Sequence, residues 1–383
     1  MSAISIYIHW PFCLSLCPYC DFNSHVSDTI DHDIWLQSYV KELLYFNEKI
    51  VGKRIRSIFF GGGTPSLMKP KLVAAIINHI ANIATIDDNS EITLEANPTS
   101  YETQKFKDFK VAGINRVSIG VQSLNESSLK ILGRKHSSSE AIAAVTSASQ
   151  LFKNYSFDLI YAIPEQTLDN WQDELRLALK IAGNHISLYQ LTIEKGTPFF
   201  KLYNNKQLIL PSNDISADMY EWTNSHLTQN NFNRYEISNY AVLGSECVHN
   251  LCYWHYDEYI GIGPGAHSRL HYDNHNIEAI MMTHKPEKWL EKVMNNGHGV
   301  QTKNLLSKDE VIKEAFMMGS RLKIGINEDH FYKTTGFKFD QVLNLNVVQQ
   351  YEHMGLLNYN KKNICLTSKG LLLHNYIIPR LLN

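Results

Sequence analysis

Residues 11–22 are Pro11-Phe12-Cys13-Leu14-Ser15-Leu16-Cys17-Pro18-Tyr19-Cys20-Asp21-Phe22. This stretch holds three of the six cysteines of the chain, and the others lie at positions 247, 252 and 365. Such clustering does not suit a disulfide framework and favours reduced thiolates that bind metal. Iron–sulfur clusters are commonly held by four cysteine thiolates. The CxxxCxxC spacing therefore predicts a [4Fe–4S] cluster on Cys13, Cys17 and Cys20, with one iron that lacks a protein ligand.

The open iron is the chemically important feature of this prediction. The amino and carboxylate groups of S-adenosylmethionine (SAM) can chelate it, which brings the sulfonium next to a one-electron donor. Zinc is the competing metal, but structural zinc takes four ligands and commonly uses paired CxxC knuckles. The next cysteine after Cys20 is Cys247. A buried apolar role for all three cysteines fits poorly with a Pro-rich, aromatic loop.

The segments that follow alternate between two patterns. Apolar β-rich runs occupy 4–10, 57–63, 92–97, 116–123, 157–164 and 185–193, and amphipathic stretches occupy 34–49, 70–83, 101–112, 139–152 and 168–181. Six such alternations predict an α/β fold with a parallel sheet, in the form of an incomplete (β/α)6 TIM-like barrel. In such barrels reactive groups lie at the carboxyl ends of strands, which is where the cysteine loop follows the first strand.

The second half of the chain has a different organisation. Residues 199–300 are less regular, with one helix expected near 213–228. From about residue 305, helical stretches at 307–321 and 339–353 precede a β pair around 356–366 and a helix from Ser368. This order predicts a small winged-helix-like α+β domain. We therefore expect a core at 1–235, a connecting region at 236–300 and a C-terminal accessory domain at 301–383.

The composition is that of an ordinary globular protein. Thirty-six basic and 38 acidic residues give a net charge of −2, so nothing indicates a nucleic-acid partner. The N-terminus lacks a basic n-region, and no window approaches the ~18 apolar residues of a membrane span. We expect a cytoplasmic protein, and a peripheral contact with a membrane stays open.

The sequence resembles the radical-SAM superfamily, and over the whole chain it is similar to the branch that contains the oxygen-independent coproporphyrinogen III oxidases and the HemW-type haem chaperones. The similar segments are IHWPFCLSLCPYCDF, FFGGGTPSL, LEANP, RVSIGVQSLN, DLIYAIP and HNLCYW. The oxidase pattern has a fourth cysteine two places after the third, and this chain has Phe22 there. This difference favours the chaperone branch.

The resemblance implies a haem chaperone in porphyrin metabolism, which binds haem, SAM and a [4Fe–4S] cluster and delivers haem to acceptor haemoproteins. Membrane-bound respiratory enzymes are among the acceptors it suggests, and a homodimer stays open. The rival hypothesis is oxidative decarboxylation of coproporphyrinogen III, and a third is an iron–sulfur sensor or scaffold. The residues leave open whether the chain turns over any substrate.

Several residues are candidates for the SAM site. The glycines of Gly61-Gly62-Gly63-Thr64-Pro65 expose backbone groups to a ligand, although a bare turn would look the same. Glu95 can accept a hydrogen bond from a ligand ammonium, or be an ordinary strand-end carboxylate. The resemblance implies SAM contacts from Tyr7, Tyr19, Gly62, Gly63, Thr64, Glu95, Gln122, Arg134 and Asp158. Ala162 and Glu165 depart from the family pattern, which has glycine at both positions.

The segment His249-Asn250-Leu251-Cys252-Tyr253-Trp254 matches the HNxxYW motif that is associated with haem in the chaperone branch. Imidazole is a common axial haem ligand, and Tyr and Trp offer flat apolar faces. The resemblance implies a haem site of His249, Asn250, Cys252, Tyr253 and Trp254, with His249 preferred over Cys252 as axial ligand. Two alternatives stay open: a zinc site of Cys247, His249, Cys252 and His255, and a histidine that is simply hydrogen-bonded.

Overall fold

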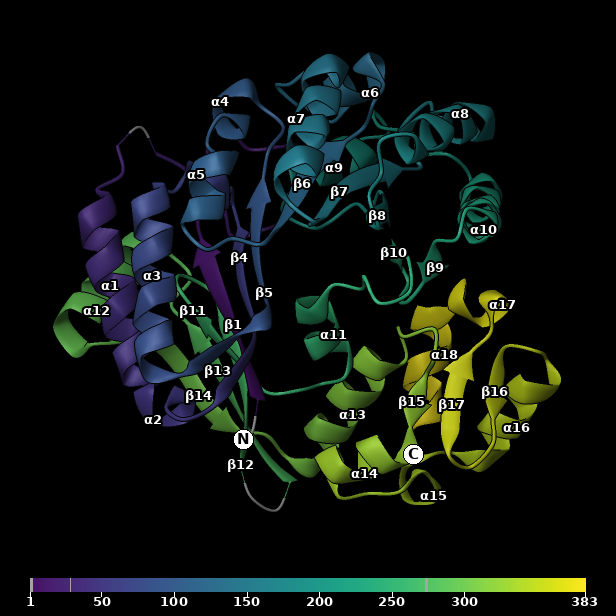
Figure 1. Ribbon diagram of the computed structural model, residues 1–383. Coiled ribbons are helices and arrows are strands. Elements are labelled where there is room, and N and C mark those ends of the chain that lie inside the picture. Colours follow the sequence, from purple (N-terminus) through teal and green to yellow (C-terminus); the bar gives the residue numbers. More distant parts are fainter. Residues whose placement is uncertain (1–2, 28, 273–274) are drawn as a thin grey trace.

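The computed structural model describes residues 3–27, 29–272 and 275–383 (Figure 1). Its centre is a row of parallel strands: β1 (Ala3–Trp10), β4 (Arg54–Gly62), β5 (Thr85–Ala96), β6 (Arg116–Gln122), β7 (Asn154–Tyr161) and β8 (His185–Gln190). Each strand pairs in parallel with the next in this order. The six strands confirm the predicted incomplete barrel, although β5 begins seven residues earlier than its apolar run indicated.

Helices connect these strands and cover the outer face of the sheet (Figure 1). They are α1 (His32–Tyr45), α2 (Asn47–Ile50), α3 (Pro70–Ile83), α4 (Ser100–Thr103), α5 (Phe106–Val111), α6 (Glu126–Ile131), α7 (Ser138–Leu151), α8 (Leu168–Leu179), α9 (Pro198–Asn204) and α10 (Asn213–Gln229). A short 3-10 helix, η1 (Pro65–Leu67), follows β4, and the cysteine loop contains the strands β2 (Phe12–Cys13) and β3 (His25–Val26). The helix predicted near 213–228 is α10.

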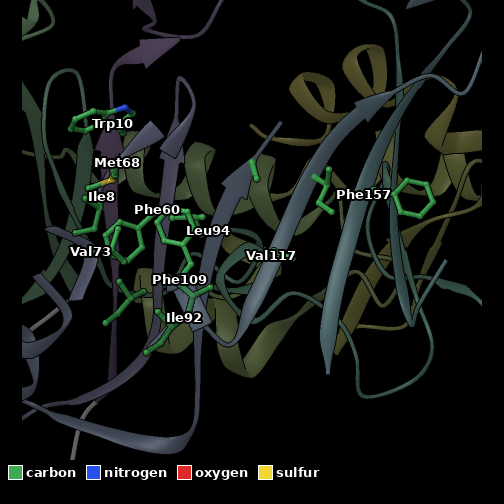
Figure 2. Close-up of a cluster of buried hydrophobic side chains, with 14 of the residues drawn as sticks. Ile8, Trp10, Phe60, Met68, Val73, Ile92, Leu94, Phe109, Val117 and Phe157 are labelled. Carbon is green, nitrogen blue, oxygen red and sulfur yellow. The ribbon is translucent and has the colours of Figure 1, made fainter. Parts of the chain in front are cut away.

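The parallel strands have an apolar outer face and a polar inner face. Side chains of successive strand residues point to opposite faces. On β1, Ile6 and Ile8 are buried outward, against the helices, whereas Ser5 and Tyr7 point inward. Figure 2 shows outward side chains of four strands, including Ile8, Phe60, Leu94 and Val117, in one cluster with Val73 of α3 and Phe109 of α5.

The inward positions differ from the aliphatic layers that usually fill a TIM barrel. Inward side chains include those of Ser57, Glu91, Arg116, Asp158 and Ser187, and burial of such groups requires hydrogen-bond partners. The barrel interior is therefore a polar chamber rather than a second apolar core.

Residues 199–300 contain more regular structure than their sequence indicated. They form β9 (Asn233–Arg234), β10 (Asn239–Ala241), α11 (Val248–Trp254), β11 (Tyr259–Ile262), β12 (His267–Tyr272), β13 (Asn276–Met282), α12 (Pro286–Asn296) and β14 (Val300–Leu305). β11 pairs in parallel with β1 as a seventh parallel strand, and β12 to β14 extend the sheet antiparallel from it. The sequence of β14 carries no clear strand pattern, because β14 is an exposed edge strand of mostly polar residues and lacks the alternation that marks a half-buried strand. Within the described residues the sheet runs from β14 to β9 without closing.

The C-terminal segment confirms the predicted helices followed by a strand pair. Its elements are α13 (Lys308–Gly319), β15 (Ile326–Asn327), α14 (Glu328–Thr335), α15 (Phe339–Val342), α16 (Leu345–His353), β16 (Leu357–Tyr359), β17 (Asn363–Leu366), α17 (Ser368–Leu371) and α18 (His374–Leu381). β16 and β17 are antiparallel, and β15 adds a third strand. A separate apolar cluster around Phe316, Phe331 and Phe339 holds this part together. α11 lies between it and the barrel (Figure 1).

In the described part of the chain, every helix is too short or too polar to cross a membrane.

Glu42 of α1 ties the helical layer to the added strands. Its fully buried carboxylate accepts hydrogen bonds from the backbone N–H of Gly263 (2.7 Å), the backbone N–H of Gly299 (2.7 Å) and Nε1 of Trp289 (3.0 Å). Burial raises the pKa of Glu42 to about 7, although these three donors act in the opposite direction. One side chain thus satisfies donors from three segments that are distant in sequence.

We predict that Glu42→Ala strongly destabilises the protein. Each of the three buried donors would lose its acceptor, at about 1–3 kcal/mol per group. The free energy of unfolding, measured by urea denaturation, should fall by more than about 3 kcal/mol. Glu48→Ala is the control, because Glu48 is exposed on α2, and should change it by less than about 0.5 kcal/mol. Equal denaturation midpoints for the two variants would contradict the prediction.

Candidate functional site

The carboxyl ends of the strands surround a cavity of about 130 Å³. Its lining contains all three cysteines of the predicted cluster and eight of the nine predicted SAM residues: Tyr19, Gly62, Gly63, Thr64, Glu95, Gln122, Arg134 and Asp158. The ninth, Tyr7, lines an adjoining cavity of about 320 Å³, which shares Phe22, Gly62 and Glu95 with the first. Residues from five strands and the cysteine loop thus meet in one region, which we call the mouth of the barrel.

The cysteine loop follows β1 and folds over this mouth. Cys13, Cys17 and Cys20 are free thiols and are partly buried. The hydroxyl of Thr64 donates to Sγ of Cys13 at 3.3 Å, and Nη1 of Arg134 donates to Sγ of Cys17 at 3.4 Å. Burial raises the pKa of Cys13 to about 11 and also raises that of Cys20. Metal binding at this loop would therefore release protons.

The residues present fit an iron–sulfur cluster. Three sulfurs, two of them with donors that stabilise thiolate charge, line the same cavity. Among the described residues no three His, Cys, Asp or Glu side chains surround a point where a single ion could bind. A cubane makes no such demand, because each thiolate binds a different iron. Gly63 permits close contact with the loop, since a Cβ there would lie 2.7 Å from the carbonyl oxygen of Phe12.

Two buried carboxylates give the mouth an acidic side. Burial raises the pKa of Glu95 to about 8, and the neighbouring charge of Asp158 acts in the same direction. Burial also raises the pKa of Asp158 to about 6, against hydrogen bonds from Ser187 and Ser118. Oε2 of Glu95 accepts a hydrogen bond from the backbone N–H of Gly62 at 3.2 Å. A cationic ligand would relieve the repulsion between these groups, so the pair suits an ammonium or sulfonium.

Arg134 connects the cysteine loop to the opposite wall. Its Nη2 donates to Oδ1 of Asn97 at 2.6 Å and to the carbonyl of Gly120 at 2.7 Å. Asn97 in turn donates to the hydroxyl of Thr64 at 3.1 Å. Asn97 was not predicted as a site residue, although it lies in the LEANP segment. Nε of Arg134 is buried and has no partner among the residues that the structure describes.

Strained backbone occurs at or just after the carboxyl ends of β6 and β7. Gln122 has φ of 67°, and the two positions where the family pattern has glycine also adopt the left-handed conformation, with Ala162 at 57° and Glu165 at 66°. This conformation costs a non-glycine residue about 1–2 kcal/mol. The fold therefore retains a glycine-type loop even where the sequence has lost the glycines.

A hydrogen-bonded chain lines the adjoining cavity. The hydroxyl of Tyr7 lies 3.0 Å from Nδ1 of His9, and Nε2 of His9 lies 2.9 Å from the carbonyl of Asn23. Burial lowers the pKa of His9 to about 4, so its ring is neutral. His9 and Asn23 were also missed at the sequence level, because an isolated histidine or asparagine carries no spacing signal.

The HNxxYW residues lie on α11, and apart from Tyr253 they do not line either cavity of the mouth. The ring of His249 is buried in the barrel, with Nδ1 at 2.8 Å from the hydroxyl of Ser57 and Nε2 at 2.9 Å from that of Tyr253. The ring stacks on Phe59 with a centroid distance of 4.9 Å. Burial lowers the pKa of His249 to about 3. Both ring nitrogens thus have protein partners, and one hydrogen bond must break before His249 can bind iron.

The other four motif residues face different surroundings. Cys252 is buried with Sγ 3.7 Å from the carbonyl of Glu258, Tyr253 lines the cavity that contains Tyr7, Trp254 lines a pocket against the C-terminal segment, and Asn250 is partly buried. The structure therefore does not gather the five predicted haem residues around one pocket. The alternative zinc site lacks support too, because Sγ of Cys247 donates to Glu91 while Cys252 points toward Glu258.

Two protein families match parts of this chain. Residues 7–178 match the Radical SAM superfamily, and residues 306–373 match the HemN C-terminal domain. The chain is similar over 99% of its own length to a solved structure of coproporphyrinogen III oxidase (HemN) from Escherichia coli, with a TM-score of 0.82 and 20% identity over 89% of that chain. At this identity the likeness concerns the fold.

Two curated relatives are more similar to this chain in sequence than that solved structure is. The "Heme chaperone HemW" of Haemophilus influenzae is 38% identical over 89% of this chain and 88% of its own length. "Radical S-adenosyl methionine domain-containing protein 1, mitochondrial" of Danio rerio is 37% identical over 99% of this chain and 86% of its own length. With matches of this extent to both groups, the chain belongs to the HemW-type family of radical SAM proteins.

Proposed function

We propose that this protein is a haem chaperone, which binds haem together with a SAM-coordinating [4Fe–4S] cluster and delivers the haem to acceptor haemoproteins. The observation that carries the proposal is the combination of a three-thiol loop at the barrel mouth with the HNxxYW helix α11 and the chaperone relatives. Phe22 supports it against oxidase activity: its side chain is 64% exposed at the rim of both cavities, where the oxidase pattern has a cysteine.

The residues at the mouth have separable roles in this proposal. Cys13, Cys17 and Cys20 would hold the cluster, which supplies an iron for SAM and a one-electron donor. Glu95 and Asp158 balance the positive charge of SAM, and Arg134 stabilises the thiolate of Cys17 through its hydrogen bond. The glycine turn 61–63 lets backbone groups approach the ligand without side-chain collision.

Other parts of the proposal concern organisation and location. We propose the division into a core at 1–235, a connecting region at 236–300 and an accessory domain at 301–383. We propose that the protein is cytoplasmic and meets membrane-bound acceptors through a peripheral contact with the membrane. A homodimer belongs to the same proposal.

The proposed function predicts haem transfer without porphyrinogen turnover. Anaerobically reconstituted protein, loaded with haem, should lose it to an apo-haemoprotein, as followed by absorbance of the acceptor. With SAM, a reductant and coproporphyrinogen III, the same protein should form no protoporphyrinogen. Clear turnover would establish the oxidase alternative, and failure of the protein to bind haem would leave an iron–sulfur sensor or scaffold.

We predict that Cys13→Ser, Cys17→Ser or Cys20→Ser abolishes cluster binding. Loss of one of three thiolates leaves two protein ligands for a cubane that normally has four. Iron and sulfide content after anaerobic reconstitution should fall to near zero, and the visible absorbance should disappear. Cys365→Ser is the control, because Cys365 lies on β17 of the C-terminal sheet. A preparation that contained only zinc at this loop would contradict the assignment.

We predict that Glu95→Gln weakens SAM binding. The substitution keeps the shape of the side chain but prevents it from becoming the negative carboxylate that a bound cation would stabilise, and a hydrogen bond to a charged group is worth about 1.5–3 kcal/mol. Calorimetric titration of reconstituted protein should show a Kd raised by about tenfold or more. Glu221→Gln makes the same charge change at an exposed position of α10 and should leave the Kd unchanged. An equal Kd in both variants would remove Glu95 from the SAM site.

A further inference from the structure

A groove of about 780 Å³ lies beside the carboxyl end of β7, between α8 and α10. One wall is the segment 164–169, which joins β7 to α8, and the other is the segment 207–211 together with Ile215 and Asp218 of α10. Helices α8 and α10 lie side by side in Figure 1 and pack against each other. We call this feature the α8–α10 groove. It shares no lining residue with either cavity of the mouth.

The lining of the groove presents apolar side chains to solvent. Ile209 is 77% exposed and Ile215 is 41% exposed, although both are aliphatic. Leu208 and Leu210 beside them are half-buried. Exposed apolar patches with a polar rim mark interaction sites. A second molecule that covered these side chains would remove apolar surface from water.

Three carboxylates form the rim. Glu165, Asp169 and Asp218 line the groove and are exposed, and its lining contains no Lys, Arg or His among the described residues. None of the three forms an ion pair in the part of the chain that the structure describes. The α8–α10 groove is therefore an apolar surface with an uncompensated acidic rim.

Hydrogen bonds behind the lining fix the shape of the groove. The side chain of buried Gln166 accepts from the backbone N–H of Ile163 at 3.3 Å and donates to Glu174 at 3.4 Å. Nε1 of Trp171 on α8 donates to the hydroxyl of Thr223 on α10 at 2.7 Å. A surface that is already formed in the free protein loses less conformational entropy when it binds.

An apolar cluster connects the groove to the cysteine loop. Leu208 and Leu210 of the groove and Tyr19 of the loop pack on the same buried cluster, which includes Phe199. The ring centroids of Tyr19 and Phe199 are 6.3 Å apart, and the backbone N–H of Phe199 donates to the carbonyl of Pro18 at 2.9 Å. A molecule in the groove is thus separated from the cysteine loop by one cluster, and it leaves the mouth open.

The chemistry of the lining favours one class of ligand. Small-molecule sites enclose the ligand and orient it with a few precisely placed polar groups, whereas the charged groups of this groove are exposed at its rim. An anionic membrane surface or a nucleic acid would meet like charge here. An amphipathic helix of another protein fits, because it places its apolar face in such a groove and its flanking cations at the rim.

We propose that the α8–α10 groove binds a partner protein through an amphipathic helix whose apolar face is flanked by lysines or arginines. Ile209 and Ile215 contact the apolar face of that helix, and Glu165, Asp169 and Asp218 pair with its cations. The proposed function does not use this surface, so the two proposals can fail separately.

The test is a titration of the reconstituted full chain with a fluorescent synthetic peptide of leucine and lysine, patterned as an amphipathic helix and followed by anisotropy. A second peptide has glutamate in place of every lysine and should bind at least about tenfold more weakly. The combined variant Glu165→Gln/Asp169→Asn/Asp218→Asn should raise the Kd of the leucine–lysine peptide by about tenfold or more. Added salt should weaken the binding of this peptide to wild type, because it screens exposed charges.

Matched control variants make the same chemical changes at exposed positions outside the groove. Glu48→Gln/Asp88→Asn/Asp340→Asn also removes three negative charges and should leave the Kd unchanged. Ile209→Ser should raise the Kd, whereas Val111→Ser, at an aliphatic residue of α5 that is 84% exposed, should not. Circular dichroism and cluster iron content verify that each variant is folded, and the Kd for SAM should be that of wild type in all of them.

Three outcomes would overturn the inference. The leucine–lysine peptide does not bind wild type, or the folded groove variants bind it as their controls do, or sedimentation shows a wild-type dimer that the groove variants convert to monomers. The last result would assign the groove to a second copy of this chain. A wild-type protein that carries no haem is a separate result, because it contradicts the proposed function and leaves the groove untouched.

Discussion

Glu91 of β5 holds the amino end of helix α11 against the inner face of the barrel sheet. Its carboxylate accepts hydrogen bonds from the first N–H groups of the helix, at Val248 (3.0 Å) and His249 (3.1 Å), and the thiol of Cys247 donates to it at 3.3 Å. A carboxylate is well placed at a helix amino end, where unpaired N–H groups and the helix dipole meet. From this anchor α11 fills one part of a chamber whose wall is polar. A barrel lined by Ser, Glu and Arg cannot be packed with aliphatic side chains alone. Helix α11 supplies polar partners for this lining.

Strand β5 contacts α11 and the mouth at two separate positions along its length. Glu91 holds α11, and Glu95 faces the mouth four residues later, which corresponds to about 13 Å along the strand. Tyr253 connects them, since its hydroxyl contacts His249 while its side chain lines the cavity of Tyr7. Packed, hydrogen-bonded side chains thus connect the mouth to α11, and α11 in turn contacts α13 of the C-terminal segment.

Charge at the mouth follows from the same polar lining. Glu95 and Asp158 lie on neighbouring sides of a buried cavity, and Arg134 reaches it from beyond β6. Burial makes each of these groups sensitive to what is bound, because a charge that is uncompensated in a low-dielectric site is costly. The charges at the mouth therefore suit a ligand that is cationic near the carboxylates, and the arginine suits a thiolate sulfur.

The sequence by itself determined the cysteine loop, the six β/α units, the C-terminal helices with their hairpin and the residues that line the mouth. These features are local, since strand alternation, CxxxCxxC spacing and strand-end position are properties of short segments, and parallel strands bring their carboxyl ends to one edge. Only the tertiary structure decided the partners of Glu42, the roles of Asn97 and His9, the added strands β11 to β14 and the separation of His249 from Trp254. Those features depend on contacts between residues up to hundreds of positions apart, and on which side of a seven-residue helix faces the barrel, so no local pattern contains them.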